Sequence, residues 1–353
     1  MTASRAPSIR IRDTETRTFL VTGGSGFLGS ALVRRLVADG HHVRVLDDES
    51  RGRSARLADL ADRAGLEIVQ GDVRDASAVI AAARGVDVIC HLAYVNGTRF
   101  FYEKPDLVLD VAVKGMVNVL DACRANEVRE LLLVSSSEVY HDPPRVPTDE
   151  AVPLTIPDVS NPRFSYAAGK LISEVMAINA GRQGFDRVVV VRPHNVYGPD
   201  MGHEHVIPEL VAKLRGLLDT PADPIKLQIQ GSGDETRAFV YVDDFIEGLM
   251  TALTCGEHLG IYHVGTQDEV SIKDLAERIG RCLGRQIEVV PGEIQRGSPR
   301  RRCPDISKVS ALGYRPRVSL DDGLAKAVAW YAGQTPAAAQ PGADVPALGG
   351  IKA

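Results

Sequence analysis

A tyrosine and a lysine are spaced for proton transfer in a stretch with helical periodicity. Tyr166 and Lys170 stand four residues apart, so on a helix their side chains share one face. The ammonium group would then stabilise the phenolate form of the tyrosine. Such a tyrosine can accept the proton of an alcohol while a nicotinamide cofactor takes the hydride from the same carbon. Pairs with this spacing also arise by chance, so the prediction depends on the neighbouring motifs.

Three serines and a glutamate follow an apolar run that predicts a buried strand. Ser135, Ser136, Ser137 and Glu138 come directly after residues 131–134. Ligands of parallel α/β sheets bind at the carboxyl ends of the strands, so these side chains are candidates for the site. Two interpretations of Glu138 stay open. Its carboxylate is a base close to the substrate, or it only caps or orients the loop after Ser136.

A glycine-rich turn between a predicted strand and a predicted helix provides a place for a phosphate. Gly23 allows a sharp turn, Gly26 lets a phosphate approach the backbone, and Gly29 lets the helix and the strand pack closely. The free N–H groups at the helix start, at Phe27 and Leu28, face the anion, which the helix dipole favours. A second strand follows this helix, and the whole context predicts a dinucleotide site.

An acidic residue at the end of that second strand distinguishes between the two nicotinamide cofactors. Asp47 lies eighteen residues after the last of these glycines. Its carboxylate would accept hydrogen bonds from the adenosine ribose and repel a 2′-phosphate, and Asp48 adds to the repulsion. NAD is therefore favoured over NADP. Arg51 and Arg53 keep NADP as the alternative, which the NAD and NADP affinities of an Asp47→Ala variant would test.

Apolar runs alternate with helical periodicity along most of the chain. The strands predicted from these runs are apolar on both faces, and helices separate them, which indicates a parallel sheet covered on both sides. We therefore expect an α/β fold with a doubly wound parallel sheet. Two of the covering helices, at 110–125 and 165–179, are apolar over a broad arc, so each could also pack against another subunit. Strands are predicted at 19–22, 42–47, 67–70, 86–90, 130–134, 187–191 and 260–265.

After residue 192 the pattern changes, because prolines interrupt short helical and strand-like stretches. A smaller mixed α/β substrate lobe, made from 193–236 and 266–331, fits this change. The dinucleotide-binding domain then comprises 17–192 and 237–265. Residues 1–16 are interpreted as a flexible arm, and residues 332–353 as a flexible tail rich in alanine, proline and glycine.

The composition excludes several classes of protein. With 353 residues, 44% of them hydrophobic, and a net charge of −5, the chain is a globular protein rather than a disordered or nucleic-acid-binding one. Apolar runs are too short for a membrane span, and the start lacks the apolar core of a secretory signal, so we expect a cytoplasmic protein. The five cysteines never pair as Cys-x-x-Cys, and His203 and His205 are interpreted as pocket lining. No metal is therefore expected.

Together these motifs resemble those of the extended short-chain dehydrogenase/reductases, in particular the NAD-dependent nucleotide-sugar epimerases and dehydratases. The resemblance covers residues 18 to 331 and implies a Rossmann sheet, a nucleotide-sugar substrate and a homodimer formed through helices 110–125 and 165–180. It rests on TGGSGFLG at 22–29, Asp47, GDVRD at 71–75, HLA at 91–93, SSSEVY at 135–140, YAAGK at 166–170, RPHNVYGP at 192–199, RAFVYVDD at 237–244 and RCPDISK at 302–308.

The resemblance also implies a role for individual residues. Ser136, Tyr166 and Lys170 would form the catalytic triad, with Lys170 also holding the nicotinamide ribose. The cofactor would lie along Ala93 and place its adenine at Asp72 and Val73. Asn195, Arg237 and Arg302 would hold the diphosphate of the sugar nucleotide, for which a planar guanidinium is well suited. The alternative for the two arginines is a surface ion pair with Asp243 or Asp305.

Departures from the family pattern leave the reaction open. His141 stands where glycine usually follows the Val-Tyr pair. Ser137 and Glu138 resemble the pair found in GDP-mannose 4,6-dehydratases and UDP-glucuronate decarboxylases, but residues 94–101 do not resemble the substrate loop of those decarboxylases. Our first hypothesis is an epimerase that oxidises C4 to a transient 4-keto sugar. The alternatives are a 4,6-dehydratase or a decarboxylase that uses Glu138, and a non-catalytic dinucleotide sensor, which would not need the tyrosine–lysine pair.

Overall fold

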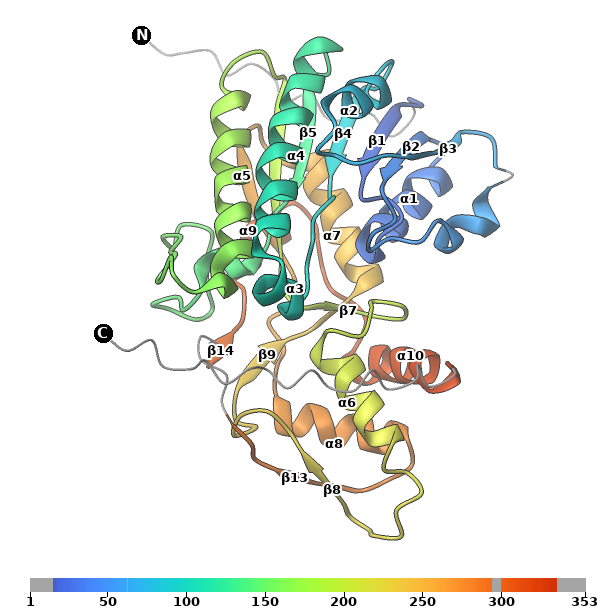
Figure 1. Cartoon of the computed structure of the whole chain (residues 1–353), viewed down its shortest axis with the longest axis vertical. Coiled ribbons are helices and arrows are strands. Elements are labelled where there is room, and N and C mark those ends of the chain that lie inside the picture. The colour runs from blue at the N-terminus through green and yellow to red at the C-terminus, as the bar shows by residue number, and fades with distance from the viewer. Residues whose placement is uncertain (1–14, 62, 294–299, 335–353) are drawn as a thin grey trace.

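Seven strands form the sheet on which the chain is built, in the order β3-β2-β1-β4-β5-β6-β11 (Figure 1). The computed structural model describes residues 15–61, 63–293 and 300–334. Neighbouring strands in this sheet are parallel, which confirms the predicted doubly wound α/β fold. The strands are β1 (Thr18–Thr22), β2 (His42–Asp47), β3 (Leu66–Gln70), β4 (Val88–His91), β5 (Glu130–Val134), β6 (Arg187–Pro193) and β11 (Gly260–Val264).

Side chains of the central strands alternate between two apolar layers. Phe19 and Val21 of β1 pack under helices on one face of the sheet, and Leu20 packs under helices on the other face. A strand buried on both faces is apolar at successive positions, which is why unbroken apolar runs predicted these strands. The first layer contains α1 (Phe27–Ala38) and α7 (Val242–Cys255), and the second contains α2 (Ala76–Ala82), α4 (Pro105–Ala125) and α5 (Ser165–Gly181).

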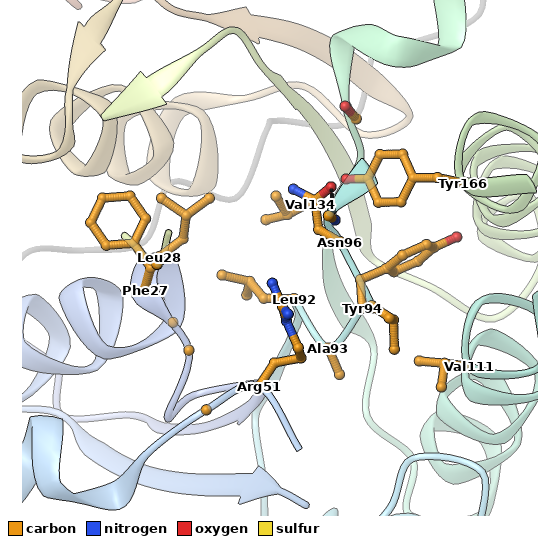
Figure 2. Close-up of a pocket in the computed structure, with 18 of the residues that line it drawn as sticks. Phe27, Leu28, Arg51, Leu92, Ala93, Tyr94, Asn96, Val111, Val134 and Tyr166 are labelled. Carbon is orange, nitrogen blue, oxygen red and sulfur yellow. Dashed lines mark hydrogen bonds between the residues drawn. The ribbon is translucent and has the colours of Figure 1, made fainter. Parts of the chain in front are cut away.

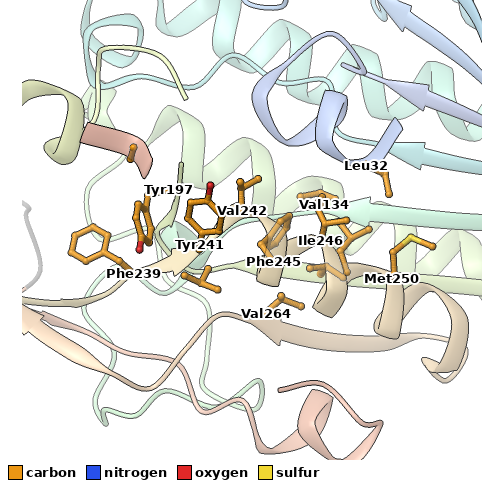
Figure 3. Packing of buried hydrophobic residues seen from close by; sticks show 14 of the residues in the cluster. Leu32, Val134, Tyr197, Phe239, Tyr241, Val242, Phe245, Ile246, Met250 and Val264 are labelled. Atoms are coloured by element: carbon orange, nitrogen blue, oxygen red, sulfur yellow. The ribbon is translucent and has the colours of Figure 1, made fainter. Parts of the chain in front are cut away.

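Helix α7 connects the sheet to the rest of the molecule. Figure 3 shows Phe245 and Met250 of this helix in one apolar cluster with Val134 of β5. The cluster continues beyond the start of α7 with an aromatic pair, Tyr197 and Tyr241. Their rings meet at 75° with the centroids 5.6 Å apart. The packing therefore holds the carboxyl edge of the sheet against the segments that follow β6.

Smaller elements fill the second part of the molecule, at the bottom of Figure 1. Three small sheets are described there, with the orders β10-β7, β12-β9-β14 and β13-β8. Their strands are β7 (Val196–Tyr197), β8 (Ile225–Gln228), β9 (Thr236–Ala238), β10 (Val240–Tyr241), β12 (Glu269–Ser271), β13 (Ile287–Val290) and β14 (Arg301–Arg302). The helices of this part are α6 (Val206–Arg215), α8 (Ile272–Cys282) and α10 (Leu320–Gly333), while α9 (Ser307–Ala311) lies against β11.

Some elements differ in their bounds from the sequence prediction. Strand β4, expected over 86–90, runs from Val88 to His91. Just before it, the side chain of Asp87 accepts a hydrogen bond from the backbone N–H of Thr18. Helix α4, expected from residue 110, begins at Pro105, since proline is tolerated in the first helical turn. The short helix α3 (Thr98–Glu103) just before it was not predicted.

The predicted flexible arm and tail fall almost entirely on residues 1–14 and 335–353, which lie outside the described residues. Across the part that the structure describes, no helix is both long enough and apolar enough to cross a membrane.

Candidate active site

A cavity of about 670 Å³ lies at the carboxyl edge of the large sheet. Ligands of parallel sheets bind at this edge. Figure 2 shows Phe27 and Leu28 on one side of the cavity and Tyr94 and Tyr166 on the other. The structure brings most predicted site residues into its lining: Gly23, Gly26, Phe27, Leu28, Gly29, Asp47, Asp72, Val73, Ala93, Ser136, Ser137, Glu138, Tyr166, Lys170, Asn195 and Arg302.

The glycine turn has the tight form that was predicted. Gly23 has a φ of +71°, a conformation that favours glycine, and a Cβ atom on Gly29 would lie only 2.0 Å from the carbonyl oxygen of Gly23. Helix α1 begins at Phe27, directly after this turn. The first N–H groups of a helix have no acceptor within it, so the turn and the helix start together suit an anion such as a diphosphate.

Asp47 ends β2 inside the cavity lining and is 8% exposed. Its carboxylate accepts hydrogen bonds from the backbone N–H groups of Ser25, at 2.9 Å, and Glu49, at 2.8 Å. Burial raises the pKa of Asp47, and these two donors oppose that rise. The carboxylate is thus fixed at the strand end, and its contact with an adenosine ribose stays a prediction.

Ser136 and Tyr166 meet at the far side of the cavity. Ser136 precedes the 3₁₀ turn η2 (Ser137–Tyr140), and its hydroxyl accepts a hydrogen bond from the backbone N–H of Glu138. The Tyr166 ring stacks on Phe101 of α3, with the centroids 5.1 Å apart. Burial raises the pKa of Tyr166 and a hydrogen bond with Ser136 opposes the rise, so the phenol needs a positive charge nearby to lose its proton at neutral pH.

Lys170, the third residue of the predicted triad, supplies a positive charge near that phenol. Its side chain is 2% exposed, and Nζ donates a hydrogen bond of 2.7 Å to the carbonyl oxygen of Val134. The Nζ atom lies 5.8 Å from the centroid of the Tyr166 ring. Burial lowers the pKa of Lys170 to about 7, although the Glu174 carboxylate opposes this. The geometry lets Lys170 influence Tyr166 through its charge.

Glu138 forms an ion pair that the sequence did not indicate. Its carboxylate accepts a hydrogen bond of 2.6 Å from Arg302 of β14, in place of the ion pair with Asp243 or Asp305 that was the alternative for this arginine. Burial alone would raise the pKa of Glu138, but the positive charges of Arg302 and Arg163 outweigh it and hold that pKa below its usual value. Glu138 is therefore an anion held in place and a weak base.

The other two predicted substrate residues occupy different positions. Asn195 lines the cavity with a φ of +41°, and its side-chain amide donates to the carbonyl oxygen of Ala238 at 3.2 Å. Among the described residues, Arg237 is not part of the lining. It lies opposite Arg302 in the parallel pairing of β9 and β14. Burial, followed by repulsion from Arg302, lowers the pKa of Arg237 to about 10.

Sequence reasoning missed several lining residues. Tyr94 and Phe101 lie against the tyrosine–lysine pair, and Arg163 is a charge near Glu138. The departure of residues 94–101 from the family pattern was the available signal for the first two. Glu204 was also not predicted; it lines the cavity and forms an ion pair of 2.9 Å with Arg51, the residue that kept NADP as the alternative. His203 and His205, which the sequence analysis interprets as pocket lining, do lie in the lining. Within residues 15–61, 63–293 and 300–334 no group of side chains is arranged to hold a metal ion.

The sequence is similar to enzymes with several related activities. A family model described as "Epimerase: NAD dependent epimerase/dehydratase family" matches residues 19–265. The chain is 34% identical over 319 residues to UDP-glucose 4-epimerase of Mycolicibacterium smegmatis, covering 88% of this chain and 97% of the relative. It is 32% identical over 310 residues to UDP-glucuronic acid decarboxylase 6 of Arabidopsis thaliana, covering 86% of each chain.

Solved structures show the same spread of activities. A dTDP-glucose 4,6-dehydratase from Streptomyces venezuelae with NAD bound has a TM-score of 0.79 at 31% identity, covering 89% of this chain and 97% of that one. The UDP-glucose 4-epimerase of Thermus thermophilus in complex with NAD has a TM-score of 0.76 at 29% identity, covering 90% of this chain and 100% of that one. Similarity alone therefore does not separate epimerase, dehydratase and decarboxylase.

Proposed function

The chain belongs to the NAD dependent epimerase/dehydratase family, and from the geometry of its site and its similarity to a UDP-glucose 4-epimerase we propose that it is a UDP-hexose 4-epimerase. It is an NAD-dependent enzyme that modifies nucleotide sugars. The observation that carries the finer proposal is the contact between Glu138 and Arg302. This contact lowers the basicity of Glu138, the carboxylate close to Ser136 that could remove a proton from C5 of the sugar. It does not involve Ser136, Tyr166 or Lys170, the residues proposed for C4 oxidation.

The cavity residues fit NAD. The glycine turn leaves no room for a Cβ atom at Gly29, and the helix start behind it offers N–H groups to a diphosphate. Asp47 ends the adjacent strand within the same lining, in a position suited to an adenosine ribose. When bound, NAD accepts a hydride from C4 of the sugar and later returns it.

Each side chain of the site has a separate role in the proposed reaction. Tyr166 removes the proton of the C4 hydroxyl, and Ser136 donates a hydrogen bond to the C4 oxygen. Lys170 favours the phenolate form of Tyr166 through its charge. Asn195 and Arg302 are suited to the diphosphate side of the substrate. Epimerisation requires only that the hydride returns to the other face of the 4-keto sugar.

A second reaction class is favoured by a specific observation. Glu138 lines the cavity together with Arg163 and Arg302, so a substrate carboxylate or an acidic C5 hydrogen would meet charged groups there. Loss of water or of carbon dioxide from the 4-keto sugar is the alternative outcome. A non-catalytic sensor is disfavoured, because it needs neither Tyr166 nor Lys170.

A panel of UDP-, dTDP-, GDP- and CDP-sugars tests the proposal. The purified protein, incubated with each sugar and NAD, should interconvert a UDP-hexose and its C4 epimer, as followed by NMR of the products. Products that lack the C6 hydroxyl or C6 itself would replace the epimerase proposal with the alternative. If NAD binds and every sugar is recovered unchanged, the sensor hypothesis takes its place.

We also propose that the enzyme is a homodimer. Helices α4 and α5 lie side by side on one face of the sheet (Figure 1), and together they expose an apolar surface. We call this surface the α4/α5 face; it consists of Leu109, Val113, Val117, Ile172 and Val175, which are 36% to 46% exposed. Two such helices from each of two subunits would bury this face in a four-helix bundle.

If the α4/α5 face forms the dimer, a charged substitution on it should change the mass of the protein in solution. Wild-type protein should scatter light as about twice 38.0 kDa at micromolar concentration, and Val175→Arg, which places a charge at the most exposed of these residues, should give the monomer. Val159→Arg is the matched control, because Val159 is 94% exposed and lies outside this face. A wild-type monomer, or a dimer that survives Val175→Arg, contradicts the proposal.

A further inference from the structure

The ammonium group of Lys170 lies against an aromatic ring. Its Nζ atom is 3.4 Å from the centroid of the Tyr94 ring, closer than the 5.8 Å that separates it from the centroid of Tyr166. The Nζ atom donates a hydrogen bond to the carbonyl oxygen of Val134. A cation over the face of an aromatic ring is attracted by the electron density of that face, most strongly where water is excluded. Lys170 is 2% exposed, so water is largely excluded from this contact.

Tyr94 is held in this position by the helix that carries Lys170. Its hydroxyl lies 3.4 Å from the Ser173 hydroxyl of α5, and its ring meets the Tyr166 ring edge-on at 82°. A Cβ atom on Gly169 would lie 2.9 Å from the Tyr94 hydroxyl oxygen. The glycine of the Tyr-Ala-Ala-Gly-Lys motif thus makes room for this phenol.

We propose that Tyr94 is a positioning residue that holds the Lys170 ammonium group against its ring face and keeps it charged beside Tyr166. The inference rests on the proposed function, in which the charge of Lys170 supports the phenolate. Tyr94 acts through Lys170 and takes no proton itself. The Val134 carbonyl fixes one side of the ammonium group and the Tyr94 ring fixes another.

Other charged or titratable groups near Lys170 do not make this ring redundant. Glu174, on the next turn of α5, favours the charged lysine, but its carboxylate is already bound to Arg192 at 2.5 Å and to Ser135. His91 at the end of β4 is buried, and burial together with the charge of Lys170 lowers its pKa to about 3. His91 is therefore neutral and does not affect the charge of Lys170. Tyr166, also on α5, is the group that the charge of Lys170 acts on in the proposed function.

A titration of Lys170 tests the proposal without any substrate. In protein labelled with ¹³Cε-lysine, the Lys170 signal is the one lost in Lys170→Met, and its midpoint is followed by NMR. Tyr94→Phe should leave the midpoint nearly unchanged, because the ring remains. Tyr94→Leu should lower it by about one pH unit. Phenylalanines with one, two and three ring fluorines at position 94 should lower it stepwise, since fluorine withdraws electron density at nearly constant volume.

The outcomes separate this inference from the proposed function. Equal midpoints across the fluorinated series, in proteins with wild-type circular dichroism, overturn the role of Tyr94, whatever the enzyme acts on. If Tyr94→Leu does not fold, the fluorinated series still decides. Where the sugar panel has identified a substrate, kcat should fall about tenfold in the trifluorinated protein and less than twofold in Tyr94→Phe, with KM unchanged. Conversely, a panel without any turnover removes the proposed function and leaves the titration result standing.

Discussion

Replacing Tyr166 with phenylalanine is expected to reduce kcat by about three orders of magnitude, the usual loss when a general base is removed. Only the hydroxyl disappears, so the ring keeps its stacking on Phe101 at 5.1 Å and its edge contact with Tyr94 at 5.4 Å. The free energy of unfolding and the NAD affinity should therefore change little. Rates of epimer formation, measured with the UDP-hexose that the panel identifies, check the expectation.

The pH dependence of the same variant separates a lost base from a distorted site. Burial raises the pKa of Tyr166 and lowers that of Lys170 to about 7, so Lys170 loses its charge before the phenol titrates. In the wild type, kcat should fall as the pH rises through about 7, because a neutral Lys170 no longer supports the phenolate. In Tyr166→Phe that fall should disappear. Retention of more than about a tenth of the rate, with the fall intact, would assign the base to another residue.

Local patterns predicted the parts of the site that are built locally. The turn at Gly23 and the pair Tyr166–Lys170 each depend on residues within one strand, turn or helix, where spacing determines geometry. His141 was noted as a departure from glycine, and the structure keeps a glycine-like φ of +55° there. Its ring packs edge-on against Phe164, with the centroids 4.9 Å apart. A histidine thus stands in a conformation that favours glycine.

Contacts between distant segments could not be predicted in the same way. Glu138 and Arg302 are 164 residues apart in the chain, and no periodicity connects a turn after β5 with the two-residue strand β14. The direction of Tyr94 depends on the space that Gly169 leaves on another element. Composition and spacing assign such residues to loops, whereas packing between elements decides which way they point.

The Glu138–Arg302 pair provides the second large expected effect. Removing the carboxylate leaves Arg302 beside Arg163 without its 2.6 Å partner. A hydrogen bond to a charged group contributes about 1.5–3 kcal/mol, so Glu138→Ala should lower kcat/KM by roughly 10- to 150-fold, mainly through KM. Glu138→Gln keeps an oxygen that can accept from Arg302 and should stay within about threefold of the wild type. Kinetics of the two variants, purified in parallel, make the comparison.

Turnover in deuterated water decides what Glu138 does. Once C4 is a ketone, the C5 hydrogen is acidic, and dehydration or 5-epimerisation requires a base to remove it, whereas 4-epimerisation never breaks that bond. The low pKa that Arg302 and Arg163 impose on Glu138 makes it a poor base, so the product should carry no deuterium at C5 and should keep its C6 hydroxyl. If deuterium enters at C5, and Glu138→Gln loses about two or more orders of magnitude in rate, Glu138 is the base and the dehydratase or 5-epimerase reaction replaces the 4-epimerase. Loss of C6, with the original C5 hydrogen retained and one deuterium taken up at C5 where C6 was bound, would instead identify a decarboxylase, in which the arginines beside Glu138 receive the substrate carboxylate.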